Sequence, residues 1–197
     1  MKKNHLPKWC NIALCILLSQ FLFLSVSAQQ IKYHAKDDIS LIISGTSTLH
    51  DWDMKGAKGE VEAVFTLNNV GRLHELHALS VNVPAESLKS EFTAMDKNAY
   101  KALKTNKVAS ITYHLVSASV AADGTIKTTG KLSIAGTTII TNVDAIAKIN
   151  PDKSISVSGS KQISMKEYGI TPPTFMMGTI KTGNDIVLKF SVTLKNK

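Results

Sequence analysis

Two histidines lie close enough in the sequence to suggest a metal site. His74 and His77 are three residues apart. The helical motif of zinc proteases needs its two histidines four residues apart, so that both fall on one face. If this stretch is a strand, positions 74 and 77 point to opposite faces of the sheet and cannot bind one ion. We favour exposed histidines over a metal site, and we predict no metal and no cofactor.

Two carboxylates flank Trp52 and could support hydrolysis if a strand holds them. Asp51 and Asp53 would then share one face, about 7 Å apart. Carboxylates at such a distance act on glycosidic bonds. No further catalytic group accompanies them, and Gly159-Ser160 lacks the flanking residues of a nucleophile elbow. We predict that the protein is not an enzyme, and an enzyme that uses Asp51 or the histidines is the alternative.

These side chains belong to a chain whose apolar and polar residues alternate after residue 28. The final segment shows it best, because Ile186, Leu188, Phe190, Val192 and Leu194 fall on one face. Period two predicts β-strands, and a sheet with one apolar face has to roll into a barrel or sandwich. Short links favour an all-β, antiparallel, eight-stranded barrel. Its strands are expected near residues 39–44 (extended to 52), 61–67, 79–83, 111–115, 126–134, 143–149, 155–165 and 185–194.

One segment breaks the alternation. Apolar residues recur at helical spacing between Met95 and Leu103, and Thr93 followed by Asp96 resembles an N-terminal cap. We predict one short α-helix at residues 93–104 that covers one end of the sheet.

Turn residues separate the remaining segments. Asp123-Gly124 and Gly183-Asn184 are each predicted to form a turn. Residues 169–178 are expected to be irregular, because Pro172-Pro173 cannot take part in ladder pairing.

The first residues have the composition of a secretory signal. A basic start precedes an apolar run at residues 12–24, and Val26-Ser27-Ala28 offers the small residues that signal peptidase cleaves. We predict a signal peptide at residues 1–28 and a single domain at residues 29–197. The protein would be exported to the periplasm or secreted.

Removal of this signal changes the chemistry of the chain. Cys10 and Cys15 are the only cysteines and both leave with it, so the mature domain has no disulfide. The net charge of +8 falls to +5, because three of the 23 basic residues and none of the 15 acidic ones are removed. A mildly basic surface suits either an anionic lipid surface or plain solvation. We predict no nucleic-acid partner, because the lysines are scattered and Arg72 is the only arginine.

The apolar residues leave open whether the barrel is filled. An eight-stranded interior holds either side chains or one slender ligand. Met165, Met176 and Met177 add adaptable apolar surface. Residues expected to face inward include several small ones, which would leave room: Ala63, Ser117, Gly130, Ala145 and Ala147.

Four stretches of the chain resemble one known family. They are GTSTLHDW at residues 45–52, the segment at 87–105, GKLSIAGTT at 130–138 and MKEYGITPPTFMMGTIKTGNDIVLKF at 165–190. In them the chain resembles the YceI-like proteins, exported lipocalin-like barrels that bind polyisoprenoid lipids. The resemblance implies an extended lipocalin-like barrel with an apolar tunnel. Such a tunnel holds a polyprenyl chain, for example a quinone tail or a polyprenyl phosphate.

With this fold, we predict a periplasmic carrier that works by binding and release. Residues 169–178 would form a lip of the tunnel. The partners would be a polyisoprenoid or related lipid and, transiently, a membrane surface, while the oligomeric state, a homodimer included, is left open. The alternative is a structural or protein-docking barrel with a filled core. The residues predicted to line the tunnel are Trp52, Phe65, Val81, Tyr113, Leu132, Ile134, Met165, Met176 and Phe190.

Overall fold

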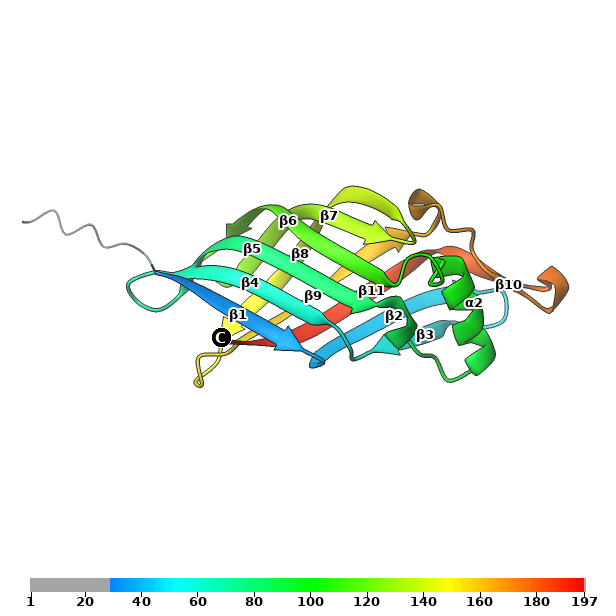
Figure 1. The fold of residues 1–197 in the computed structure, drawn as a ribbon, viewed down its shortest axis with the longest axis horizontal. Helices are drawn as coiled ribbons and strands as arrows, with labels where there is room; N and C mark the ends of the chain where they lie inside the picture. Colours follow the sequence, from blue (N-terminus) through cyan, green and yellow to red (C-terminus); the bar gives the residue numbers. More distant parts are fainter. Residues whose placement is uncertain (1–28, 197) are drawn as a thin grey trace, which may run out of the picture.

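The computed structural model describes residues 29–196, so the predicted signal peptide at residues 1–28 lies outside the described residues. Within them the chain forms eleven strands, one α-helix and short 3-10 helices (Figure 1). The strands are β1 (Gln30–Lys36), β2 (Ile39–Ser47), β3 (Trp52–Gly56), β4 (Glu60–Leu67), β5 (Leu73–Pro84), β6 (Ser110–Val120), β7 (Thr125–Ile134), β8 (Thr137–Ile149), β9 (Ile155–Ser164), β10 (Thr174–Phe175) and β11 (Ile180–Asn196). The helices are η2 (Ala85–Ser87), α2 (Thr93–Leu103), η3 (Lys166–Tyr168) and η4 (Met176–Gly178).

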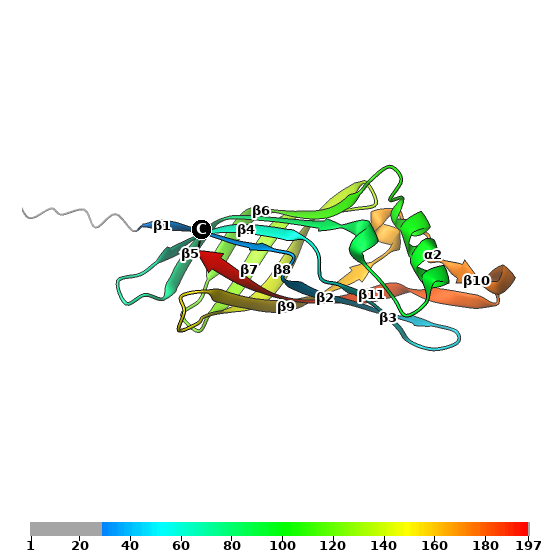
Figure 2. The same ribbon diagram turned by 60° about the horizontal axis from the view of Figure 1, so that its bottom comes forward.

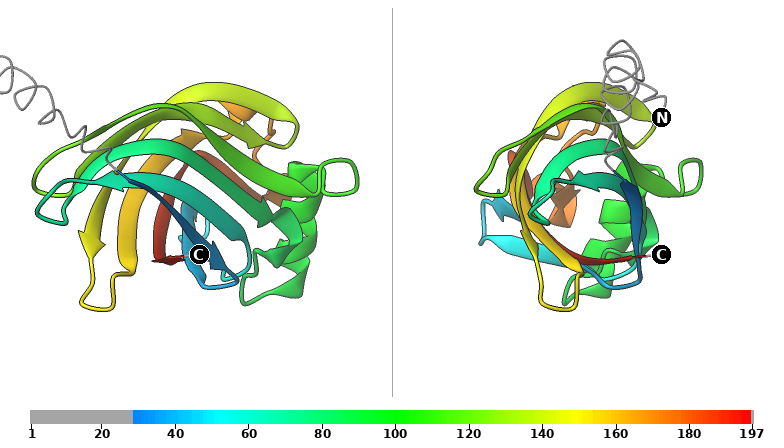
Figure 3. Two further views of the ribbon diagram at one scale, coloured as in Figure 1. Left: turned by 60° about the vertical axis from the view of Figure 1, so that its left-hand side comes forward. Right: turned by 90° about the vertical axis from the view of Figure 1, so that its left-hand side faces the viewer.

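Eight of the strands close an antiparallel barrel. Their order round the ring is β1, β4, β5, β6, β7, β8, β9 and β11. The ring closes because the last residues of β11 pair with β1, with Tyr33 opposite Asn196. Elsewhere β11 pairs with β2, so that β2 and β3 continue the sheet beyond the ring, which Figure 3 shows end-on. The prediction of an all-β, antiparallel eight-stranded barrel with one helix is confirmed.

The β5 strand begins at Leu73, well before the predicted start at residue 79. Its register against β4 shifts twice, and each shift leaves one extra residue on β5, His77 and then His74. These bulges place the inward apolar residues three apart, at Leu73, Leu76 and Leu79. A bulge inserts one residue on one strand only. The period-two pattern is therefore lost in the first half of β5, and alternation does not predict a strand there.

The predicted turn at Gly183-Asn184 is wrong. Both residues belong to β11, where the register against β2 shifts between Thr182 and Ile186. The amide of Asn184 fixes the irregular stretch, because its Nδ2 donates to Ser164 Oγ at 2.9 Å and its Oδ1 accepts from the backbone of Lys166 at 3.0 Å. The Asp123-Gly124 turn between β6 and β7 is confirmed, and its glycine has a φ of 89°.

Helix α2 is where the apolar spacing predicts it, but its cap differs. The N-cap position is Phe92, which has extended backbone and makes no side-chain cap. The carboxylate of Asp96 instead accepts hydrogen bonds from the backbone N–H of Ser90 at 2.7 Å and from its hydroxyl at 2.8 Å. The helix lies at the end of the barrel where β3 and β10 also lie (Figures 1 and 2).

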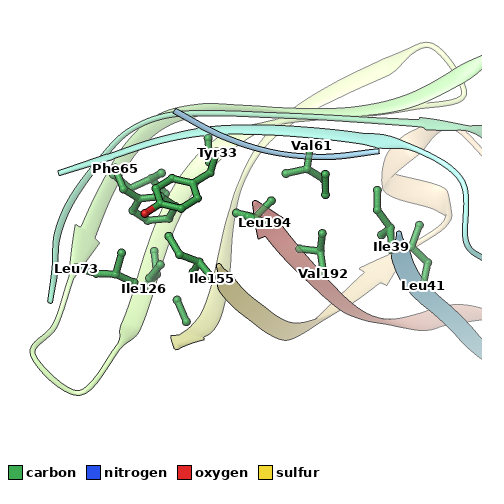
Figure 4. Packing of buried hydrophobic residues seen from close by; sticks show 14 of the residues in the cluster. Tyr33, Ile39, Leu41, Val61, Phe65, Leu73, Ile126, Ile155, Val192 and Leu194 are labelled. Atoms are coloured by element: carbon green, nitrogen blue, oxygen red, sulfur yellow. The ribbon is translucent and has the colours of Figure 1, made fainter. Parts of the chain in front are cut away.

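The opposite end of the barrel is filled by its own side chains (Figure 4). Tyr33 and Phe65 meet edge to face, with ring centroids 6.0 Å apart, and Ile155 and Leu194 are buried beside them. Such a cluster closes this end.

No helix within residues 29–196 has the length and apolar character needed to span a bilayer.

Candidate ligand-binding cavity

The interior of the barrel holds a cavity of about 530 Å³. Its walls reach from Phe65 and Leu194 in the filled end to Phe92 and Phe175 at the end covered by α2. The volume lies within the roughly 300–1,000 Å³ of typical small-molecule sites. The barrel is therefore plugged at one end and hollow along the rest of its length.

The lining of the cavity is almost wholly apolar. No Asp or Glu of the described chain belongs to it, and Lys161 and His50 are its basic side chains. The other polar side chains of the lining are Ser47, Asn98, Thr112, Tyr113, Thr128, Thr174 and Thr182. A cavity of this kind can shield an apolar chain from water but lacks paired carboxylates or an activated nucleophile.

Eight of the nine side chains predicted to line the tunnel do border the cavity. They are Trp52, Phe65, Val81, Tyr113, Leu132, Ile134, Met165 and Phe190. Met176 is the one that does not, because it lies in η4 and is 70% exposed. Its φ of 49°, followed by 56° at Met177, turns the backbone left-handed and directs both side chains outward. Contact with a ligand stays a prediction for all nine residues.

Three of these aromatic side chains lie across glycines of neighbouring strands. A β-carbon at Gly45 would come within 2.6 Å of Trp52 Cε2, and one at Gly130 within 2.5 Å of the Tyr113 hydroxyl. A β-carbon at Gly159 would come within 2.5 Å of Phe190 Cζ. Aromatic side chains that cover glycines of a β-sheet help to fix its register. The rings thus lie along the wall and leave the lumen open.

The small residues expected to make room are only partly placed as predicted. Ala63 and Ala145 border the cavity, whereas Ala147 is buried without bordering it. The space at Gly130 is taken by the Tyr113 ring. Ser117 is exposed, because the register of β6 against β7 shifts between Leu115 and Ser117 and reverses the alternation.

The polar atoms deepest in the lining satisfy one another. The Tyr113 hydroxyl lies 2.7 Å from Thr128 Oγ1, which donates to the carbonyl of Val143 at 2.8 Å. Since the threonine hydrogen is used there, the tyrosine hydroxyl is the donor in the first bond. Burial raises the pKa of Tyr113 above its ordinary value of 10.0. The phenol is therefore a neutral part of the wall.

Helix α2 supplies a wall that sequence reasoning left out of the lining. Ala94, Met95, Asn98, Ala99, Ala102 and Leu103 all border the cavity. The outer side of the helix is tethered to the segment before it, where the Tyr100 hydroxyl is 2.8 Å from the carbonyl of Leu88 and 3.0 Å from that of Glu86. The helical spacing of these residues is the sequence signal for an inward face of α2, although the sequence prediction gives the helix only the role of covering an end.

Strand β2 also lines the cavity, through Ile39, Leu41 and Ile43. These residues alternate in the sequence, so their inward face was predictable. The alternation does not show which inward residues border the cavity, because this depends on how far the cluster around Tyr33 and Phe65 fills the barrel.

The histidines and carboxylates that could suggest catalysis are not assembled. His74 and His77 are both exposed, and His77 Nε2 contacts Thr66 Oγ1 at 2.6 Å and Glu75 Oε2 at 3.3 Å. Asp51 and Asp53 are exposed and do not border the cavity. Among the described residues, no group of three or more His, Cys, Asp and Glu side chains could hold a metal ion.

The family can be assigned from the match that spans the barrel. Residues 33–194 match the family model described as YceI-like domain. The chain belongs to the YceI-like family. The matched region contains α2 and all strands from β2 to β10, together with parts of β1 and β11. No curated protein matches the chain.

Solved structures share the YceI-like barrel at low sequence identity. BcnA of Burkholderia cenocepacia is 12% identical, with a TM-score of 0.63 over 79% of this chain and 96% of that chain. The YCEI protein of Campylobacter jejuni is 21% identical, with a TM-score of 0.55 over 70% and 81%. A polyisoprenoid binding domain from Saccharophagus degradans, implicated in plant cell wall breakdown, is 9% identical, with a TM-score of 0.63 over 86% and 100%. At these identities the likeness shows the fold.

Proposed function

We propose that this YceI-like protein is a carrier that holds a polyisoprenoid lipid in its barrel. The observation that carries the proposal is the apolar cavity of about 530 Å³ along the barrel axis, which has no carboxylate in its described lining. Family membership and the fold shared with a polyisoprenoid binding domain support the ligand class. A quinone tail and a polyprenyl phosphate both fit this description.

Burial of the ligand would supply the driving force. Each methylene removed from water gains about 0.8 kcal/mol, so a five-carbon isoprene unit gains up to roughly 4 kcal/mol. The realised affinity is lower, because ordering a flexible chain costs entropy. The lining offers shielding and no reactive group, which supports binding and release rather than catalysis. A docking module with a filled core would not keep such a cavity, so we favour the carrier.

We also propose that the protein is exported to the periplasm and meets a membrane there. Export is supported by the composition of residues 1–28. Membrane contact is supported by large apolar side chains exposed at the α2 end of the barrel, near the mouth of the cavity. They are Leu49, Phe92, Phe175, Met176 and Met177. The N-terminal mass of the exported protein tests export, because cleavage after Ala28 predicts a chain that begins at Gln29.

Organic extraction of protein purified after export, followed by mass spectrometry, tests the carrier function. We expect a polyisoprenoid species at close to one molecule per protein chain. A clean extract, together with no uptake of quinone analogues by the purified protein, would instead favour the docking module.

A further inference from the structure

A single lysine faces into the apolar cavity from β9. The inward residues of this strand are Ile155, Val157, Gly159, Lys161 and Ile163, of which all but Gly159 and Ile155 border the cavity. Lys161 is half-buried and lies opposite Leu188 of β11. The alternation along β9 and the lining of the cavity both place Lys161 on the interior face of the barrel.

The ammonium group of Lys161 has no partner within the described part of the chain. Among the described residues it makes no ion pair or hydrogen bond, and the cavity lining contains no carboxylate that could reach it. The ammonium adds a positive charge to a lining that is otherwise almost wholly apolar. A leucine or methionine would serve packing better at this position. The lysine is therefore better explained by what it binds than by what it packs against.

The position of Lys161 in the sheet is also unusual. The pairing of β8 with β9 ends at Asp144 and Ser160, and Lys161 is the first residue of β9 beyond it. From this point toward the α2 end, β8 pairs only with β7 and β9 only with β11. The lysine thus lies where the barrel wall loses its continuous ladder.

We propose that Lys161 binds the anionic head group of the prenyl lipid, a phosphate or a carboxylate. A lysine ammonium acts as a compact positive charge and forms charge-assisted hydrogen bonds with such groups. The apolar walls on either side would take the chain. This inference rests on the proposed carrier function and narrows its ligand class from polyisoprenoids in general to acidic ones. A neutral quinone or alcohol would leave the lysine unpaired.

Binding of three farnesyl probes to protein purified after export tests this assignment. The probes are farnesyl phosphate, farnesoic acid and farnesol, which share one chain and differ in the head group. Trp52 is the only tryptophan after residue 28 and borders the cavity, so its fluorescence reports occupancy. We expect the acidic probes to bind more tightly than farnesol, and the stronger of the two identifies the head group.

Three variants separate the charge from the packing. Lys161→Met should weaken the acidic probe by about tenfold or more, the loss expected for a charge-assisted hydrogen bond, and leave farnesol binding unchanged or tighter. Lys161→Arg should retain most of the preference. Lys189→Met is the matched control, because Lys189 is exposed on the neighbouring strand opposite Ser160.

The outcomes distinguish this inference from the carrier proposal. If farnesol binds but the acidic probes bind no better, or if Lys161→Met weakens all three probes equally, the head-group assignment is overturned and the carrier proposal stands. If no probe and no longer prenyl chain binds the wild-type protein, both fail.

Discussion

The indole of Trp52 lies across Gly45, its register partner on β2, and its Nε1 donates to the carbonyl of Thr46 at 3.0 Å. A β-carbon at position 45 would overlap the ring. The glycine thus allows a large aromatic side chain to border the cavity without filling it. Phe190 covers Gly159, its register partner on β9, in the same way. Tyr113 covers Gly130 diagonally, because the register partner of Gly130 is Leu115.

The variant Gly45→Ala should force the Trp52 ring away from the wall. Overpacking of this kind destabilises a protein by about 1–3 kcal/mol, and we expect that loss in the free energy of unfolding measured with denaturant. Trp52 fluorescence should change in the folded state. In a Trp52→Ala background the same substitution should cost much less, because the clash is gone. An equal cost in both backgrounds would contradict the packing described.

The alternation of apolar and polar residues predicts only part of the cavity wall. It assigns Phe190 to an inward face correctly, because β11 is regular from Ile186 onward. It does not report bulges, so it missed the start of β5 at Leu73 and placed Ser117 inside. It also cannot report which glycine a ring covers, since Gly130 and Tyr113 meet only when β6 and β7 pair. Residue type alone places Met176 in the lining, whereas the left-handed backbone of η4 directs its side chain outward.

A cavity-blocking pair on β8 should separate ligand binding from stability. Ala145 borders the cavity, whereas its neighbour Ile146 points outward and is 63% exposed. Ala145→Phe should lower the amount of co-purified lipid by about tenfold, because the added ring occupies the lumen. Ile146→Phe should leave lipid content at the wild-type level. Both variants are compared by mass spectrometry of extracts, with circular dichroism as the check on folding. Equal lipid in the two variants would count against the cavity as the binding site.

Buried tyrosines should make the barrel sensitive to alkali. Burial raises the pKa of Tyr33, Tyr113 and Tyr168 above the ordinary value of 10.0. Above that pH the unfolded chain loses phenolic protons that the folded protein still holds, so the free energy of unfolding falls as the pH rises. Denaturant unfolding between about pH 9 and pH 11 should show this fall. Tyr113→Phe should make the fall shallower, and a slope unchanged by that substitution would contradict the contribution of Tyr113.

The tether of helix α2 should control how often this wall of the cavity opens. Tyr100→Phe removes the hydroxyl that reaches the carbonyls of Glu86 and Leu88. The loss of one such bond costs about 0.5–1.5 kcal/mol, and amide exchange within α2 should accelerate by a corresponding factor of about 2–12. Amides of β4 serve as the internal control, because its buried residues Val61, Ala63 and Phe65 belong to the cluster at the opposite end of the barrel, which contains no residue of α2. Uniform acceleration in both elements would show global destabilisation instead of local opening.

The exposed methionines of η4 should mediate contact with a lipid surface. Met176 and Met177 are exposed in η4, which follows β10 at the α2 end of the barrel (Figure 1). Lys97 and Lys101 are exposed on α2 and can attract anionic lipids. Replacement of both methionines by aspartate should reduce binding to anionic phospholipid vesicles by about tenfold, because apolar burial is lost and repulsion is added.

Sedimentation with vesicles measures this effect, and Val70→Asp provides the matched control, because Val70 is 77% exposed in the turn between β4 and β5 at the opposite end of the barrel. That variant should bind vesicles like the wild-type protein. If Val70→Asp weakens sedimentation as much as the double substitution does, the contact is a general effect of charge and the α2 end has no special role in docking.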